Sequence, residues 1–321
     1  MSEHDRPAPS HLTPALPVAA RLADRARSRS RELRVRGRLA AAGLERVTRA
    51  VLTGAGLPIK KEFLVLGCGT GADASGLFSE VAAVIGALEH YEAWRSIYAG
   101  LQVDFKNHGL YHDSTAGDNW WEYYFESINL GSAAGAVTRA VAALQHDAFA
   151  YRVEQSMPRT TAAAVVGRHV RIKPFVIERV ERFWREALAS DRVIGVHYRG
   201  TDKAEDAAAI PYDTMSTAIR AALQAEGPGR CQIFVATDDQ AFLDHARAVF
   251  PDQVHALPMR RSEDGRPLHK THGEGFSQGA DAVIDCLLLA RCHRLIRTTS
   301  NLSLCSTLFN PALPVTLLGR G

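Results

Sequence analysis

Short apolar runs alternate with amphipathic stretches through the second half of the chain. The run 193–198 is short and apolar at most positions, which is typical of a strand buried on both faces. The stretches between such runs place apolar residues every three or four positions, as helices do. This alternation predicts βαβ units and a parallel sheet. The predicted strands are 193–198, 232–236, 254–257, 294–296 and 314–318, and the predicted helices are 212–225, 239–249, 277–291 and 303–308.

The first half shows the same alternation less clearly. Residues 1–14 are rich in proline and polar side chains, which indicates disorder, and residues 15–53 place leucines among arginines in a helical pattern. A chain of 321 residues is long enough for one large or two ordinary α/β domains. The predicted elements are strands at 63–66 and 102–105 and helices at 75–88, 131–149 and 175–189.

Composition and charge are those of an ordinary globular protein, with 46% hydrophobic and 23% charged residues. The net charge of +3 is too balanced to indicate a nucleic-acid partner. The Arg-rich stretch 21–38 is either a solvated helix packed on the main body or an arm for nucleic acid or membrane, and we favour the first. Without an apolar run of signal-peptide or membrane-span length, we expect a cytoplasmic protein with no membrane span.

The five cysteines are odd in number and lack CxxC spacing. This pattern argues against a disulfide scaffold and against a zinc site, and we expect buried thiols in a reducing compartment. They are Cys68, Cys231, Cys286, Cys292 and Cys305.

Polar residues gather where three predicted strands of the second half end. Open α/β sheets bind ligands at the carboxyl ends of their strands. Arg and Lys suit an anion there, and hydroxyls at a helix start make an anion cradle. Each group also has a simpler interpretation, a solvated loop or a helix cap, with Thr237 or Asp238 as the expected cap. Together they favour a nucleotide diphosphate. The residues are His197, Arg199, Thr201, Asp202 and Lys203; Thr237, Asp238 and Asp239; and Thr299, Ser300, Asn301 and Ser303.

The motifs IGVHYRGTDK (194–203), IFVATDD (233–239) and TTSNLS (298–303), with the helix DAVIDCLLLARCHRLI (281–296), carry a family resemblance. In their order along the chain and in their residues, these motifs resemble those of the GDP-fucose-dependent superfamily of α1,6-fucosyltransferases, nodulation fucosyltransferases and protein O-fucosyltransferases. The resemblance implies an inverting, metal-independent glycosyltransferase with two Rossmann-like lobes of GT-B type and no cofactor beyond the GDP-sugar. The expected divisions are 1–60, a disordered start and Arg-rich helical extension; 61–180, the N-terminal acceptor-side lobe; and 181–321, the C-terminal nucleotide-sugar-binding lobe.

The resemblance also implies roles for single residues. Arg199 is expected to bind the β-phosphate of the donor and to offset the charge of the leaving group. His197 is expected beside the nucleotide, and Asp238 with Asp239 near the guanine. The family has Gln and Cys where this chain has Asn301 and Ser303. The remaining expected donor contacts are Thr201, Asp202, Thr237, Thr299 and Ser300.

An inverting transfer to a hydroxyl benefits from a general base close to the acceptor. In the α1,6 enzymes a Glu precedes two alanines and a Pro, and Asp206–Pro211 keeps that pattern. Asp206 is therefore the first candidate and Glu205 the second, with a solvated acidic loop as the alternative. Lys203 is expected to relay a proton or to hold the acid ionised. Gly200 departs from the family, which has a second Arg at this place.

The first lobe lacks the Gly-Asn-rich opening of the family, and the glycine-rich run 67–71 stands in its place. The aromatic residues at 120–125 are either a core layer or the wall of an acceptor cleft, and we favour the core. The acceptor is predicted no further than a hydroxyl group of a glycan or small natural product. The expected acceptor-side residues are Gly69, Gly71, Asp73, Trp120 and Trp121.

Two alternatives remain open. The run 64–71 also resembles the first motif of S-adenosylmethionine-dependent methyltransferases, with the acid for the ribose supplied by 84–89. That interpretation leaves the three later motifs unexplained. The other alternative is a non-catalytic protein that binds a nucleotide sugar, against which the retained Arg199 and the acidic pair at 238–239 argue.

Overall fold

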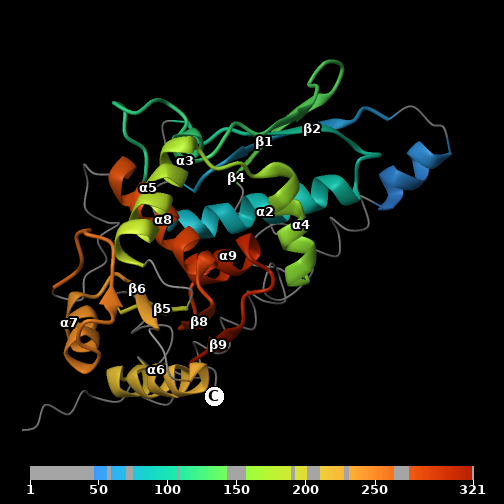
Figure 1. Ribbon diagram of the computed structural model, residues 1–321. Coiled ribbons are helices and arrows are strands. Elements are labelled where there is room, and N and C mark those ends of the chain that lie inside the picture. Colours follow the sequence, from blue (N-terminus) through green and yellow to red (C-terminus); the bar gives the residue numbers. More distant parts are fainter. Residues whose placement is uncertain are drawn as a thin grey trace, which may run out of the picture. The chain divides into compact units, whose positions relative to one another are not determined.

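The computed structural model in Figure 1 describes residues 47–55, 59–69, 75–106, 109–142, 157–188, 192–200, 210–227, 231–263 and 275–319. The chain divides into two compact units, residues 1–48 and 49–321. Every helix and strand from residue 62 onward belongs to the second unit. The predicted extension 1–60 lies mostly outside the described residues, and the division at residue 180 stays a prediction.

The described residues after 192 form a parallel sheet of five strands in the order β7-β6-β5-β8-β9. When β5 is counted as strand 1 of this sheet and β9 as strand 5, the order is 3-2-1-4-5, as in Rossmann folds. In this order the direction of strand succession reverses between strands 1 and 4 of the sheet, which are β5 and β8. This reversal is the switch point of the sheet. The predicted parallel sheet is therefore confirmed. Its strands are β5 (Val193–Tyr198), β6 (Gln232–Thr237), β7 (Val254–His255), β8 (Arg294–Arg297) and β9 (Val315–Leu317).

Side chains on β5 alternate between the two faces of the sheet, as the strand period of two requires. Ile194 and Val196 belong to the cluster that includes α6 and α7 side chains, whereas Val193 belongs to the cluster that includes α8 side chains. A Cβ at Gly195 would stand 3.0 Å from Cys292 Sγ, so the segment at the end of α8 packs closely at this glycine. The helices are α6 (Tyr212–Glu226), α7 (Gln240–Val249), α8 (Gly275–Arg291) and α9 (Asn301–Phe309).

A second sheet, with four strands among the described residues, has the order β3-β2-β1-β4. Strand β1 pairs in parallel with both β2 and β4, and β3 is antiparallel to β2. Its strands are β1 (Glu62–Gly67), β2 (Tyr98–Val103), β3 (Asn129–Gly131) and β4 (Val137–Ala142). The helices of this part are α2 (Leu77–Ala93), α3 (Trp121–Tyr124), α4 (Arg159–His169) and α5 (Pro174–Ala187).

The helix predicted at 131–149 is wrong over its described part, because residues 137–142 form β4. Val137, Thr138 and Val141 are β-branched, and the strand pairs with β1 along its whole length. The alanines in and around this segment favour a helix, but pairing with β1 outweighs that propensity. The strand predicted at 102–105 is also displaced, since β2 ends at Val103.

Helices α2, α8 and α9 lie between the two sheets (Figure 1). They share one apolar core to which both sheets contribute. Trp120 and Trp121 are buried in this core at 1% and 0% exposure, and all five cysteines are buried as well. The Tyr124 hydroxyl donates to the Phe276 backbone oxygen at 2.9 Å, which fixes the start of α8 against the aromatic residues at 120–125.

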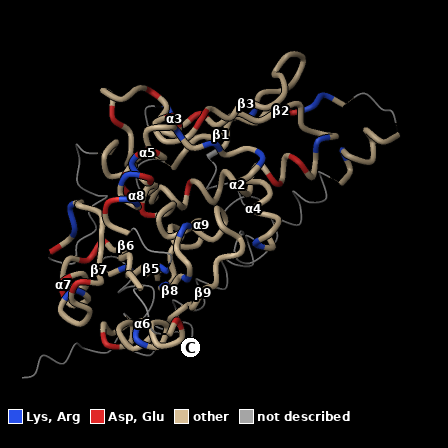
Figure 2. Tube along the Cα trace, in the orientation of Figure 1, with Lys and Arg blue, Asp and Glu red and all other residues tan. Residues whose placement is uncertain are grey.

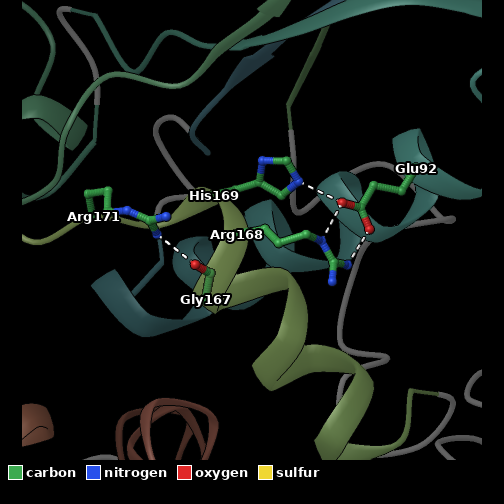
Figure 3. Close-up of polar contacts among 5 residues, drawn as sticks. All are labelled: Glu92, Gly167, Arg168, His169 and Arg171. Carbon is green, nitrogen blue, oxygen red and sulfur yellow. Dashed lines mark hydrogen bonds and ion pairs between the residues drawn. The ribbon is translucent and has the colours of Figure 1, made fainter.

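An ionic cluster joins the last turn of α2 to the end of α4 (Figure 3). Glu92 accepts a hydrogen bond from Arg168 Nε at 2.8 Å and contacts His169 Nε2 at 2.7 Å. Elsewhere along the described trace, basic and acidic residues are interspersed (Figure 2). The described part of the chain contains no helix long and apolar enough to cross a bilayer.

Candidate functional site

A cavity of about 330 Å³ lies at the carboxyl ends of β5 and β6, beside the switch point. The start of α2 forms part of its wall, and the starts of α8 and α9 form others. Segments that follow both sheets therefore contribute to one site. The residues that line it are Gly76–Ser79 and Tyr111; His197 and Arg199; Ala236–Asp238; Pro258–Arg260; Ser277, Gln278, Asp281, Ala282 and Asp285; and Ser300–Leu302.

Arg199 and His197 reach the cavity from the end of β5. The buried His197 accepts a hydrogen bond at its backbone oxygen from Thr298 N at 3.0 Å, as in a continued ladder with β8. Arg199 N in turn donates to Thr298 Oγ1 at 3.2 Å. The turn after β8 therefore fixes the backbone that carries the guanidinium.

The two acids after β6, Asp238 and Asp239, have different contacts. Asp239 is the N-cap of α7 and accepts from Phe242 N at 3.2 Å, so the cap predicted at Thr237 or Asp238 is wrong by one or two residues. Asp239 also accepts from the Tyr212 hydroxyl at 2.7 Å and does not line the cavity. Asp238 does line it, and its Oδ1 accepts from Gly200 N at 3.0 Å.

The turn 298–303 presents the start of α9 to the cavity. Ser300 is the N-cap and accepts from Leu302 N at 3.3 Å. Asn301 Nδ2 donates to Ser79 Oγ at 2.9 Å, which ties the start of α9 to the first turn of α2. Ser303 is fully buried and donates to backbone carbonyls of its own turn, and neither it nor Thr299 lines the cavity.

Two helix N-termini thus face one space beside Arg199. The first N–H groups of a helix have no partner within the helix and carry the positive end of its dipole. Both features favour an anion. The part of the wall formed by Arg199 and the two helix starts therefore suits a diphosphate.

Tyr111 was not among the predicted site residues, yet it lines the cavity. Burial raises the pKa of its hydroxyl, while a hydrogen bond from the Leu77 backbone and the positive charge of Arg199 act in the opposite direction. Tyr111 therefore lies close to both the start of α2 and the guanidinium. Nothing in its local sequence pattern distinguishes it from the other aromatic residues nearby.

Asp285 was also missed, although it belongs to the quoted helix motif. It is 3% exposed, lines the cavity, and makes no hydrogen bond through Oδ1 within the described residues. Burial raises the pKa of this carboxyl to about 8; Arg261 opposes the rise and Asp281 adds to it. An acid in the middle of an otherwise apolar helix face was the available signal.

Several predicted site residues fall outside the described residues: Gly71, Asp73, Thr201, Asp202, Lys203, Glu205 and Asp206. Their roles stay predictions. Gly69 is described but does not line the cavity. Trp120 and Trp121 are buried in the apolar core, as favoured from the sequence, and do not line this cavity. Their acceptor-side role stays a prediction.

The acid that the methyltransferase interpretation requires is also misplaced. Residues 84–89 lie within α2, not at the end of a strand. Among the described residues, no group of three or more His, Cys, Asp and Glu side chains is placed to hold a metal ion.

With a cavity at the switch point of a Rossmann-ordered sheet, the chain is a doubly wound α/β protein, a class that binds its ligands at this point. The family model described as Nodulation protein Z (NodZ) matches residues 151–314, and the chain belongs to this family. The predicted resemblance is therefore confirmed. Nodulation protein Z of Bradyrhizobium diazoefficiens is 30% identical over 156 residues, which cover 45% of this chain and 41% of that protein. The chain thus matches about two fifths of the length of this curated relative.

Solved structures show the same fold. The fucosyltransferase NodZ from Bradyrhizobium aligns with a TM-score of 0.52 at 19% identity, covering 81% of this chain and 96% of that one. A NodZ α1,6-fucosyltransferase co-crystallised with GDP has the same TM-score and identity, with 80% and 94% covered. The predicted α/β architecture of GT-B type is confirmed by this likeness.

Proposed function

We propose that this protein is an inverting glycosyltransferase that moves L-fucose from GDP-fucose to a hydroxyl group of a glycan or small natural product. The observation that carries the proposal is the convergence of Arg199 with the starts of α2 and α9 on one cavity. These groups match a diphosphate. Fucose as the sugar and guanine as the nucleobase are inferred from the family. The relative co-crystallised with GDP carries the name α1,6-fucosyltransferase, and extending that activity to this chain is part of the proposal.

Carboxyl groups in the wall of the cavity support guanine over uracil. Asp238, Asp281 and Asp285 all line it. Guanine presents N1–H and N2–H₂ donors side by side, which a carboxylate accepts together. Uracil presents one N–H between two carbonyl oxygens, which a carboxylate repels. GDP is therefore the expected nucleotide.

In the proposed reaction the acceptor oxygen attacks the anomeric carbon of the sugar from the face opposite the diphosphate. The bond between that carbon and the β-phosphate oxygen breaks, and GDP leaves with the electron pair. The acceptor proton passes to a general base, for which Asp206 and then Glu205 remain the candidates. Arg199 and the helix N-termini stabilise the charge that develops on the leaving phosphate. They supply positive charge without a metal ion, so we propose metal-independent transfer.

The first test is calorimetric titration with GDP, UDP and S-adenosylhomocysteine in the presence of EDTA. The proposal expects micromolar binding of GDP alone, followed by release of GDP from GDP-fucose in an acceptor screen. Binding of S-adenosylhomocysteine alone would overturn it in favour of the methyltransferase alternative. GDP binding without transfer to any acceptor would favour the non-catalytic alternative. The expected cytoplasmic location is tested separately, by fractionation.

Variants of Arg199 test the mechanism. Arg199→Ala should lower kcat/KM by about 2–4 kcal/mol of transition-state stabilisation. Arg199→Lys should fail nearly as badly, because a point charge does not replace a planar fork. Arg182→Ala, at an exposed position of α5, is the matched control and should leave kcat/KM unchanged. Normal kcat/KM in Arg199→Ala would remove the assigned role.

A further inference from the structure

A buried carboxyl group lies on α2 just behind the wall of the cavity. Glu80 is 1% exposed and sits among apolar residues of the helix. Its neighbours in sequence, Gly76–Ser79, line the cavity. A buried acid is costly unless it is well hydrogen-bonded, so its presence at this position needs a reason.

One carboxylate oxygen of Glu80 accepts two hydrogen bonds. Gly69 N donates to Oε1 at 2.9 Å, and Ser75 Oγ donates to the same oxygen at 2.9 Å. Gly69 follows β1, and Ser75 immediately precedes the segment that lines the cavity. A helical side chain points back toward the N-terminus of its helix, which is how Glu80 reaches both. Glu80 therefore links the end of β1 to the entry of α2.

The other oxygen of Glu80 carries a desolvation cost. Oε2 is buried and makes no hydrogen bond within the described residues. Burial raises the pKa of Glu80, and the two hydrogen bonds to Oε1 oppose that rise. An apolar side chain of similar size would fill this place without an unsatisfied oxygen. Global stability alone does not explain the acid.

The wall that Glu80 supports has room for a ligand. Gly76 has ordinary extended dihedral angles, with φ −63° and ψ 148°, and a Cβ there would meet no atom within 4 Å. Neither the backbone nor protein packing therefore requires glycine at this position. Ser79, one residue before Glu80, accepts a hydrogen bond from Asn301 Nδ2. The first turn of α2 is thus tied both to the end of β1 and to the start of α9 at the edge of the cavity.

We propose that Glu80 is a positioning residue, which holds the first turn of α2 in the place where this turn can contact the diphosphate of the donor. This inference rests on the proposed function. Glu80 itself does not touch the nucleotide. It acts through Gly69 and Ser75, whose hydrogen bonds to Oε1 set where the helix begins.

The test compares four variants by GDP titration, steady-state kinetics and thermal unfolding. Glu80→Ala removes both hydrogen bonds and should weaken GDP binding about tenfold or more. Glu80→Gln keeps a carbonyl oxygen that accepts both, and should stay within about threefold of the wild type. Ser75→Ala removes one bond and should fall between them. Val84→Ala, a buried position one turn further along α2, is the control for lost stability.

If Glu80 only stabilised the fold, the affinity for GDP would fall in step with the melting temperature across all four variants. The proposal predicts that Val84→Ala lowers the melting temperature without changing the affinity, whereas Glu80→Ala changes both. If the wild type binds GDP and Ser75→Ala and Glu80→Ala bind it equally well, the inference fails and the proposed function stands. If Glu80→Ala does not fold, wild-type affinity in Ser75→Ala alone overturns it. If the wild type does not bind GDP, both fail.

Discussion

Gly200 lies directly against the side chain of Asp239. A Cβ built at position 200 would stand 2.4 Å from Asp239 Oδ2 and 2.7 Å from Asp239 Cβ. Real Cβ atoms essentially never lie within 3.0 Å of a non-bonded heavy atom. The cap of α7 therefore leaves no space for a side chain at position 200, where the family resemblance places a second Arg.

Gly200→Ala should consequently destabilise the protein. Overpacking of this kind costs about 1–3 kcal/mol, and thermal or urea unfolding measures it. Asp239→Gly removes the obstructing side chain and keeps a residue that is tolerated at an N-cap. The double variant Gly200→Ala/Asp239→Gly should therefore be more stable than the sum of the two single effects allows. Strict additivity would show that the two residues do not compete for space.

Gly76→Ala separates ligand contact from stability. The position is open, so the free energy of unfolding should change by less than about 1 kcal/mol. If a diphosphate lies against the start of α2, the added methyl group should weaken GDP binding about tenfold or more, as titration would show. The control is Gly167→Ala on α4, where a Cβ also meets nothing within 4 Å. Equal affinity in both variants would place the ligand away from Gly76.

The sequence predicts the five-stranded sheet well because its strands have clear local patterns. Run 193–198 matches β5 at both ends, and helix 212–225 differs from α6 by one residue. Strand β5 is buried at every position, and α6 buries only one face, so in both segments the local pattern and the tertiary contacts agree. The polar ends of β5 and β6 follow from the same pattern, which is why His197, Arg199 and Asp238 are predicted and do line the cavity.

The first lobe and the far wall of the cavity depend on contacts that no local pattern contains. Strand β4 is mostly exposed and is defined by its pairing with β1, so an alanine-rich stretch suggested a helix instead. Tyr111 reaches the site because its backbone packs on Gly275, more than 150 residues away in sequence. Asp285 is as buried as a core residue, and it is marked as a site residue only by the cavity that it lines. Such tertiary relationships arise only once the chain has folded.

Glu92→Gln tests the ionic cluster of Figure 3. Hydrogen bonds from Arg168 lower the pKa of Glu92, and burial opposes them. Because the pKa of Glu92 is lower in the folded protein than in the unfolded chain, where it is near 4.3, the ionised carboxylate stabilises the fold at any pH above about 4.3. This stabilisation is lost as the pH falls through the pKa of the folded protein. Because Arg168 is half exposed, the variant should lose only about 1–3 °C in melting temperature at pH 7.

The same difference should shrink below about pH 4 and in high salt, where the carboxylate is protonated or screened. Melting curves of both proteins between about pH 7 and pH 3.5 measure it. A difference that stays constant over this range would mean that the amide disturbs packing and that charge plays no part.

We predict that the protonation of Asp285 makes nucleotide binding depend on pH. Its carboxyl has a folded pKa of about 8 because it is buried, with Arg261 opposing and Asp281, itself paired with Arg179, reinforcing the rise. The unfolded value is near 3.9, so between about pH 4 and pH 8 the native state holds a proton that the unfolded chain releases. The contribution of Asp285 to stability therefore falls as the pH rises through this window. Asp285→Asn should melt progressively higher than the wild type from about pH 5 to pH 8.

Guanine requires the opposite protonation state of Asp285. Its N1–H and N2–H₂ groups donate, so the carboxyl must lose its proton to accept both. Binding of GDP at pH 7 should release close to one proton, which calorimetry in buffers of different ionisation enthalpy measures directly. Asp285→Asn should release none and bind GDP about ten- to a hundredfold more weakly, the usual loss for a charge-assisted hydrogen bond. Binding without proton release in the wild type would mean that the base does not meet this carboxyl, and Asp238 would then be the group to test.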